Sequence, residues 1–429
     1  MGINTKINFN HTKKLQYILS IFISLIPLSM VIGAAIMEFF IISTCLLFFY
    51  LNFKKIGLIY YKNFFFIIFI IFCIFLIFSS TTSENIFNSL RNTLFYFRFG
   101  ILVLAIWYLL DSFKKFKIIF FYLISITFII IIISTILQIL FFQDQIIYNN
   151  RIAGLFGDEL VQGSFLLRMT PIFVVFYLYN KNNLNKNFVF FYNAILISAF
   201  FLIIISGERA AIFLTFIAIF LTFLFLKLSL KKISIIILSI IVVAALAFKI
   251  FPEIKERVID RTFNEVFYKS DLSNKAINKK ISLFSEGHQD HIETGILIFK
   301  NHFIKGVGVR NYRVECKKDI YKKIGKYYCT THPHNTFIQI LSETGIIGFI
   351  FFMFFLGFVY LKLYINFKDI YLKSREIDTK VVILLIIIVV NFFPLVPSGS
   401  FFNNWLSTLY FFPIGLILYE LNYKKDLAK

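Results

Sequence analysis

Five of the six histidines of this 429-residue chain lie in one polar segment, residues 251–333, or directly after it. They are His288, His291, His302, His332 and His334. The imidazole of histidine titrates near neutral pH, so one of these side chains could accept a proton from a hydroxyl group as a general base. Imidazole is also a common metal ligand, and metal chemistry is therefore a competing interpretation of the same residues.

A metal site would use His288 and His291, which lie three residues apart on one helical face, with His332 and His334 completing the set. Asp290 would be the nearby carboxylate. This spacing does not match an established zinc motif such as H-E-x-x-H. We therefore favour acid–base chemistry and expect no metal. A third interpretation, a solvated loop histidine, applies first to His302.

Arginines beside or within apolar runs are the second group of candidates. Arg209 begins an apolar run in IIISGERAAIF, Arg151 precedes IAGLFGDE, and Arg98 and Arg168 lie inside apolar runs. An arginine at membrane depth is costly unless it meets a partner, and guanidinium binds phosphate through two parallel hydrogen bonds. The set would suit a diphosphate. The alternatives are contact with lipid headgroups and, for Arg209, an ion pair with Glu208.

A carboxylate and two cysteines lie close to the histidines in the sequence. Glu343 falls roughly two to three turns into a helix that begins near Asn335, where it could orient a histidine or join a buried polar network. Cys316 and Cys329 could form a disulfide in an oxidising compartment, and two free thiols are the alternative.

Most of the remaining chain consists of apolar runs long enough to cross a bilayer. Hydrophobic residues make up 59% of the sequence, and about 20 apolar residues span the hydrocarbon core as a helix. The sequence therefore predicts an all-α polytopic membrane protein. We expect about twelve transmembrane helices, near residues 15–33, 35–51, 64–80, 93–110, 118–141, 161–179, 187–206, 209–226, 232–250, 345–363, 381–396 and 401–419.

The net charge of +21 is distributed by topology. Lysine and arginine concentrate in alternate connections, which predicts that these connections and both termini are cytoplasmic. No basic stripe interleaved with stacking aromatics lies outside the spans, so we exclude nucleic-acid binding. The basic groups fall within residues 6–14, 54–62, 114–117, 181–186, 227–232, 362–380 and 424–429.

The predicted topology divides the chain into three parts. Residues 1–250 would hold nine transmembrane helices, residues 251–335 one large periplasmic loop, and residues 336–429 the last three helices. Long loops cross the membrane largely regardless of their charge. Apolar residues at helical spacing predict a short amphipathic helix over 287–302, and the glycines of KGVGVRNYRV predict a turn after it.

Three of these features together resemble the O-antigen ligase family, whose members share a C-terminal domain with O-antigen polymerases. His334-Asn335, followed after nine residues by GIIG, is similar to the histidine motif of the family. FKNHFIKGVGVRNYR is similar to its loop segment, and Arg209 in SGERAAI to its short arginine motif. Many members have an arginine where this chain has His288, and Arg310 or Arg313 could take over that role.

The resemblance implies an inverting, GT-C-like glycosyltransferase that needs neither a metal nor another cofactor, in the bacterial inner membrane with a periplasmic active site. The donor would be a glycan on undecaprenyl diphosphate, and the acceptor the lipid A–core oligosaccharide or another glycan. His334 would be the general base and Arg209 would stabilise the departing diphosphate. The substrate-binding candidates are Arg310, Arg151, His288, His291 and Glu343.

Other functions are compatible with the same residues. An O-antigen polymerase has nearly the same requirements, and a protein O-oligosaccharyltransferase would use a serine or threonine acceptor. A transporter of lipid-linked glycans belongs to another class. It should show polar or broken helices at the membrane midplane, whereas these spans are mostly isoleucine, leucine and phenylalanine.

Overall fold

A computed structural model describes residues 2–53, 59–142, 151–226, 228–267, 284–372 and 378–427 of the chain. Every regular element within these ranges is helical, which confirms the predicted all-α class. The helices are α1 (Gly2–Ile32), α2 (Ala34–Leu51), α3 (Phe64–Thr81), α4 (Ile86–Thr93), α5 (Arg98–Ser112), α6 (Phe116–Phe141), α8 (Gln162–Asn180), α9 (Lys186–Ile205), α10 (Arg209–Phe225), α11 (Leu230–Ile250), α12 (Pro252–Lys255), α13 (Arg261–Phe267), α14 (Glu286–Asn301), α15 (Tyr312–Glu315), α16 (Thr336–Leu372), α17 (Thr379–Asn391) and α18 (Asn404–Leu427), with a π-helical turn, η4, at Glu256–Asp260.

A helix lies at each of the twelve predicted spans. Eight helical segments among the described residues are long and apolar enough to cross a membrane, and they include α1, α2, α3, α4 with α5, α6, α9, α11 and α16. Helices α10 and α17 are apolar but shorter. The chain is therefore a polytopic membrane protein, and the number of twelve crossings stays a prediction. Of the basic residues behind the predicted topology, Lys54, Lys55, Lys227, Lys373, Arg375 and Lys429 lie outside the described residues.

Helix boundaries follow local signals in the sequence. Gly33 lies in extended backbone between α1 and α2, which pack against each other. Residues 392–403 are non-helical and separate α17 from α18. The span predicted at 93–110 instead starts at Arg98, because a turn at residues 94–97 separates it from α4. Arg98 is held at this turn by a two-pronged ion pair with Glu38, with both contacts at 3.1 Å.

The centre of the bundle is formed by α5 and α18. Helix α5 is buried along most of its length, and α18 packs against it. A side chain at Gly415 of α18 would approach Ile106 Cβ to 2.8 Å, so the two helices touch through a small residue. The closely packed helices α5 and α18 thus form the core of the bundle that supports the more polar segments.

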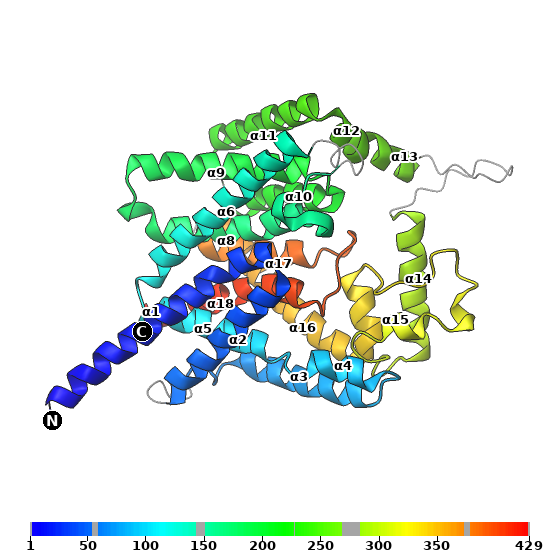
Figure 1. Ribbon diagram of the computed structural model, residues 1–429, viewed down its shortest axis with the longest axis horizontal. Helices are drawn as coiled ribbons and strands as arrows, with labels where there is room; N and C mark the ends of the chain where they lie inside the picture. The colour runs from blue at the N-terminus through cyan, green and yellow to red at the C-terminus, as the bar shows by residue number, and fades with distance from the viewer. Residues whose placement is uncertain are drawn as a thin grey trace.

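The polar elements lie at one end of the bundle. Helices α14 and α15 are at the end opposite to both chain termini (Figure 1). Helix α14 confirms the amphipathic helix predicted for residues 287–302. The arrangement agrees with a loop and termini on opposite sides of a membrane, and the assignment of those sides to periplasm and cytoplasm stays a prediction.

Candidate functional site

Helix α16 is broken at Gly345, where the backbone has φ 63° and ψ −166°. The break leaves helical N–H and C=O groups without partners in their own helix. The segment 303–308 runs past the break and supplies these partners. Four backbone hydrogen bonds join the two segments: Ile346 N to Phe303 O (2.8 Å), Ile347 N to Ile304 O (3.4 Å), Val307 N to Ser342 O (3.0 Å) and Gly308 N to Glu343 O (2.9 Å).

Glycine is required where these backbones cross. A Cβ at Gly345 would lie 2.4 Å from Ile304 O, and a Cβ at Gly306 would lie 2.5 Å from Glu343 O. Both glycines also have positive φ, which residues with a side chain rarely adopt. The Gly306-Val307-Gly308 segment and Gly345 therefore form one backbone crossing, and its hydrogen bonds hold the loop against α16.

Four of the five candidate histidines, His288, His291, His332 and His334, form a cluster. The His334 ring centroid is 4.1 Å from that of His332, 5.2 Å from that of His291 and 5.3 Å from that of His288. His288 and His291 come from one face of α14, and the other two precede α16. His302 lies apart from them and contacts Glu315 at 3.3 Å, so it is not part of the histidine cluster.

The backbone around His334 is held on both sides. His334 has φ 51°, a left-handed conformation that is uncommon for a residue with a side chain. Its carbonyl accepts from Ser398 N at 2.8 Å. The next residue, Asn335, caps α16 by accepting from Phe337 N at 3.0 Å and donates to Pro394 O at 2.8 Å. The histidine motif thus combines a strained histidine with the cap that positions it.

The two neighbouring histidines of the motif differ in their contacts. His332 Nε2 lies 3.3 Å from Ser398 O, and its Nδ1 lies 3.0 Å from Thr331 Oγ1. Since a carbonyl oxygen only accepts, Nε2 of His332 carries the hydrogen. The ring of His334 makes no hydrogen bond within the described part of the chain. Its nitrogens are therefore available to a ligand.

The histidine cluster is neutral at physiological pH. Burial, together with the neighbouring histidines, lowers the pKa of His334 to about 3. Burial is also the main cause that lowers the pKa of His332 to about 4, with smaller contributions from Arg313 and the neighbouring histidines. Burial also lowers the pKa of His288 and of His291. Asp290, the carboxylate of the metal interpretation, instead accepts from Tyr327 N at 2.9 Å. A neutral imidazole can accept a hydrogen bond or a proton from a hydroxyl group.

Arg209 lies on the α10 side of the histidine cluster. Its Nη1 contacts Glu265 Oε2 of α13 at 2.9 Å. The alternative pairing with Glu208 is wrong, because Glu208 caps the start of α8 by accepting from Gly163 N (2.6 Å) and Ser164 Oγ (2.7 Å). The charge of Arg209 contributes to lowering the pKa of His288.

Arg310 and Glu343 lie on the α16 side. Arg310 has φ 59°, and its Nη2 donates to Phe402 O at 3.2 Å. Glu343 is fully buried, and its Oε2 accepts from Gln339 Nε2 at 3.0 Å. Gln339 also bonds to Ser400 Oγ at 2.9 Å. Of the two roles considered for Glu343, the structure therefore shows membership of a buried polar network.

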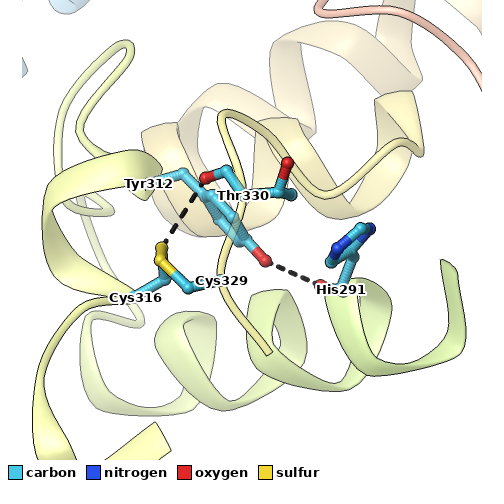
Figure 2. Close-up of a disulfide and its surroundings, with 5 residues drawn as sticks. All are labelled: His291, Tyr312, Cys316, Cys329 and Thr330. Atoms are coloured by element: carbon cyan, nitrogen blue, oxygen red, sulfur yellow. Dashed lines mark hydrogen bonds between the residues drawn. A yellow bond between two sulfur atoms is a disulfide. The ribbon is translucent and has the colours of Figure 1, made fainter. Parts of the chain in front are cut away.

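Cys316 and Cys329 form a disulfide, with their Cα atoms 5.2 Å apart (Figure 2). The bond closes the segment that leads into Thr330 and the histidine motif. Tyr312 lies between the disulfide and α14, and its hydroxyl donates to His291 O at 2.9 Å (Figure 2). The disulfide thus joins the end of α15 to the segment before His332 and His334, and the Tyr312 hydroxyl links α15 to α14.

Residues 194–353 match the family model described as O-antigen ligase. This segment contains Arg209, all four histidines of the cluster and the break at Gly345. This segment of the chain is similar to the O-antigen ligase family, and the match covers less than half of the 429 residues. No curated protein matches the chain.

Within the matched segment the structure adds a residue that sequence reasoning missed, Arg257 of η4. Its Nε donates to Gly207 O at 3.1 Å. Burial lowers the pKa of Arg257, and the charges of Arg151 and Arg209 also contribute to lowering it. Neither spacing nor composition distinguishes Arg257 from the many other charged residues in its segment.

Several buried polar atoms of the site have no partner in the described residues. They are the Nε atoms of Arg151, Arg310 and Arg313 and His291 Nδ1. Buried polar groups in native proteins are nearly always hydrogen-bonded, so each of these needs a ligand or water. Arg151 also donates to Leu160 O at 2.6 Å, and the charge of Arg209 contributes to lowering its pKa. The charge of Arg313 contributes to lowering the pKa of His332. Arginine donors on both sides of neutral histidines fit an anionic ligand.

Proposed function

We propose that the chain is a member of the O-antigen ligase family and acts as an inverting glycosyltransferase. It transfers a glycan from undecaprenyl diphosphate to an acceptor hydroxyl, with the lipid A–core oligosaccharide as acceptor. The observation that carries the proposal is the position of His334, whose ring has no hydrogen-bond partner among the described residues and lies in a cluster of four histidines. The reaction takes place on the periplasmic face of the bacterial inner membrane, and both termini are cytoplasmic.

The chemistry is a single displacement at the anomeric carbon. The acceptor oxygen forms the new bond to this carbon while the bond to the diphosphate oxygen breaks on the opposite face. The diphosphate leaves with the electron pair, and the hydroxyl proton moves to the His334 ring. Because the diphosphate already activates the donor, the step needs neither a metal nor another cofactor.

The low pKa of His334 describes the site without substrate. A diphosphate beside the ring adds negative charge, which favours the protonated imidazole and raises its pKa. His334 is thus a hydrogen-bond acceptor before the donor binds and a stronger proton acceptor afterwards. His288 and His291, from the facing side of the histidine cluster, contact the sugar or the phosphate in this proposal.

The arginines stabilise the charge that develops on the leaving group. Arg209 acts from the α10 side with Arg151, and Arg310 acts from the α16 side. Glu343 lies behind Arg310 in the buried network and holds this side of the site in place. Donors positioned before the reaction stabilise a developing oxyanion strongly, and removal of one such donor typically slows the reaction by about 10²–10³-fold.

The test is transfer by purified protein from a lipid-linked glycan to lipid A–core, measured as the mass gained by the acceptor. We expect His334→Ala to lower the rate by about 10²–10⁴-fold and Arg209→Ala by about 10²–10³-fold. His302→Ala is the matched control, since His302 belongs to the same loop but lies outside the cluster. Transfer at the normal rate by His334→Ala would exclude the mechanism.

The same assay separates the related activities through the acceptor. Mass gained by lipid A–core indicates a ligase, mass gained by a second lipid-linked repeat unit indicates a polymerase, and mass gained by a peptide indicates a protein O-oligosaccharyltransferase. In cells that lack the protein, lipid-linked donor should accumulate on the outer face of the membrane. Accumulation on the inner face would indicate a transporter instead.

A further inference from the structure

A cavity of about 730 Å³ lies between α3, α5, α16 and α18, away from the histidine cluster. This volume falls in the range of about 300–1,000 Å³ typical of ligand sites. Lys62 and Lys362 line one end of the cavity. Helix α16 rises roughly 25 Å between Gly345 and Lys362, at 1.5 Å per residue. The lysine end therefore lies close to the membrane face opposite to the histidines.

The wall of the cavity is mainly aromatic, with Phe65 of α3 and Phe355 of α16 among its residues. Three further lining side chains are exposed on the surface of the bundle: Phe64 (66%), Phe354 (52%) and Phe358 (41%). In a polytopic membrane protein, exposed phenylalanines on such helices face lipid. The cavity thus opens sideways into the bilayer, and a hydrocarbon chain is the occupant that its wall favours.

The polar end of the cavity carries a net positive charge. Neither Lys62 nor Lys362 has an acidic partner among the described residues. Lys362 Nζ lies 5.5 Å from the centroid of the Phe358 ring, at the lateral opening. Asp111 also lines this end, and its carboxylate accepts from Tyr60 Oη at 2.6 Å. The two lysines could bind a phosphate, and the apolar wall beside them could bind the acyl chain of the same molecule.

We propose that this cavity binds an anionic phospholipid of the phosphatidylglycerol class in the leaflet opposite to the histidine cluster. One acyl chain lies among the phenylalanines between α3 and α16, and the phosphate lies between Lys62 and Lys362. The bound lipid fills the space between two helices whose other ends hold the loop: Ser79 Oγ of α3 donates to Lys305 O at 2.9 Å, and α16 carries the Gly345 break. The site is independent of the proposed glycosyl transfer.

Native mass spectrometry of the detergent-purified protein tests this site. Phosphatidylglycerol and phosphatidylcholine with identical acyl chains are titrated separately. We expect phosphatidylglycerol to bind more tightly, and Lys62→Gln or Lys362→Gln to weaken it about fivefold each and about thirtyfold together. Lys181→Gln, an exposed lysine that does not line the cavity, is the matched control and should change nothing.

A second variant tests the apolar part of the cavity. Ile68→Trp places a larger side chain in the wall and should weaken both lipids by a similar factor, while the unfolding temperature without added lipid is retained. Equal binding of the two lipids, unaffected by the double lysine variant, would overturn the proposal. Tighter binding of undecaprenyl phosphate than of phosphatidylglycerol, with the same dependence on the lysines, would overturn the phospholipid as occupant.

Discussion

The two sides of the histidine cluster are held by different kinds of interaction. On the α16 side, backbone hydrogen bonds join residues 303–308 to the break at Gly345, and a disulfide closes the segment before the histidine motif. On the α10 side, Arg209 pairs with Glu265, and the two side chains are 34% and 44% exposed. The α16 side is therefore fixed by buried and covalent contacts. On the α10 side, the guanidinium of Arg209 is held by a partly exposed ion pair.

This difference suits a substrate that arrives through the membrane. Exposed ion pairs contribute about 0–1 kcal/mol, so Arg209 can exchange a carboxylate for a phosphate at little cost. The backbone crossing at Gly345 cannot rearrange without losing several hydrogen bonds at once. We infer that the α16 side positions His334, whereas the α10 side adapts to the donor. Each of the following experiments tests one side of this contrast.

Gly345→Ala should have the largest effect. The backbone at φ 63° and ψ −166° is essentially restricted to glycine, and a Cβ would lie 2.4 Å from Ile304 O. We expect a loss of at least about 3 kcal/mol from strain and broken hydrogen bonds. The measurements are the unfolding temperature in detergent and the transfer rate, and both should fall.

Gly357→Ala is the matched control for this substitution. It lies in the same helix, and its Cβ would meet nothing within 4 Å. Alanine is the better helix former by about 1 kcal/mol, so this variant should be neutral or slightly more stable. If Gly345→Ala behaves like Gly357→Ala, the backbone crossing does not fix the α16 side.

Loss of the Cys316–Cys329 disulfide is the second test of how the α16 side is held. The bond links residues 13 positions apart, and closing a loop of this length stabilises the folded state by about 3 kcal/mol in the chain-entropy account. We expect Cys316→Ser with Cys329→Ser to leave the helical bundle intact, to make the 316–330 segment sensitive to proteolysis and to slow transfer.

A reductant gives the control for the disulfide experiment. It should reproduce the effect in the wild type and change nothing in the double serine variant. A wild type that keeps its full transfer rate after reduction would show that the disulfide does not help to position the histidines.

The sequence predicted best those features that depend on neighbouring residues. The span positions, the helix over 287–302 and the break at Gly33 follow from hydrophobic runs, apolar spacing and single glycines, because lipid and local backbone preferences act on short segments. The partner of Arg209 could not be predicted in this way. Glu265 lies 56 positions away, and only the packing of α13 beside α10 brings it close.

The site itself was only partly predictable for the same reason. Resemblance in the histidine and glycine motifs indicated His334, because the residues of each motif are close together in the sequence. The convergence of His288 and His291 with His334 depends on how α14 docks against α16, which no periodicity encodes. Arg257 lies in an irregular π-helical turn, where neither spacing nor hydropathy distinguishes it from its charged neighbours.

The pH dependence of stability tests how firmly the α16 side buries its histidines. Folding lowers the pKa of His332 and His334 to about 4 and about 3, below the ordinary value of about 6.5. As the pH falls below about 6.5, the unfolded chain binds protons that the folded chain does not, so the free energy of unfolding decreases. The window from about pH 6.5 to 5 is the most informative, because most carboxylates remain ionised there.

Unfolding temperatures measured across this window should fall less steeply for His332→Gln with His334→Gln than for the wild type. His302→Gln, at the half-exposed histidine outside the cluster, is the control and should keep the wild-type slope. Identical slopes for all three proteins would mean that the two motif histidines are accessible to protons in the folded state.

Glu265→Gln should have the smallest effect on stability. It is also the most direct test of whether the α10 side adapts to the donor. Loss of an exposed pair should change the free energy of unfolding by less than about 1 kcal/mol. Because the variant removes the carboxylate that competes for Arg209, we expect the KM for the lipid-linked donor to decrease while kcat stays unchanged. The combination with Arg209→Ala should abolish that gain. A KM that rises in Glu265→Gln would show instead that the ion pair positions Arg209 for the donor, and that the α10 side is built as rigidly as the α16 side.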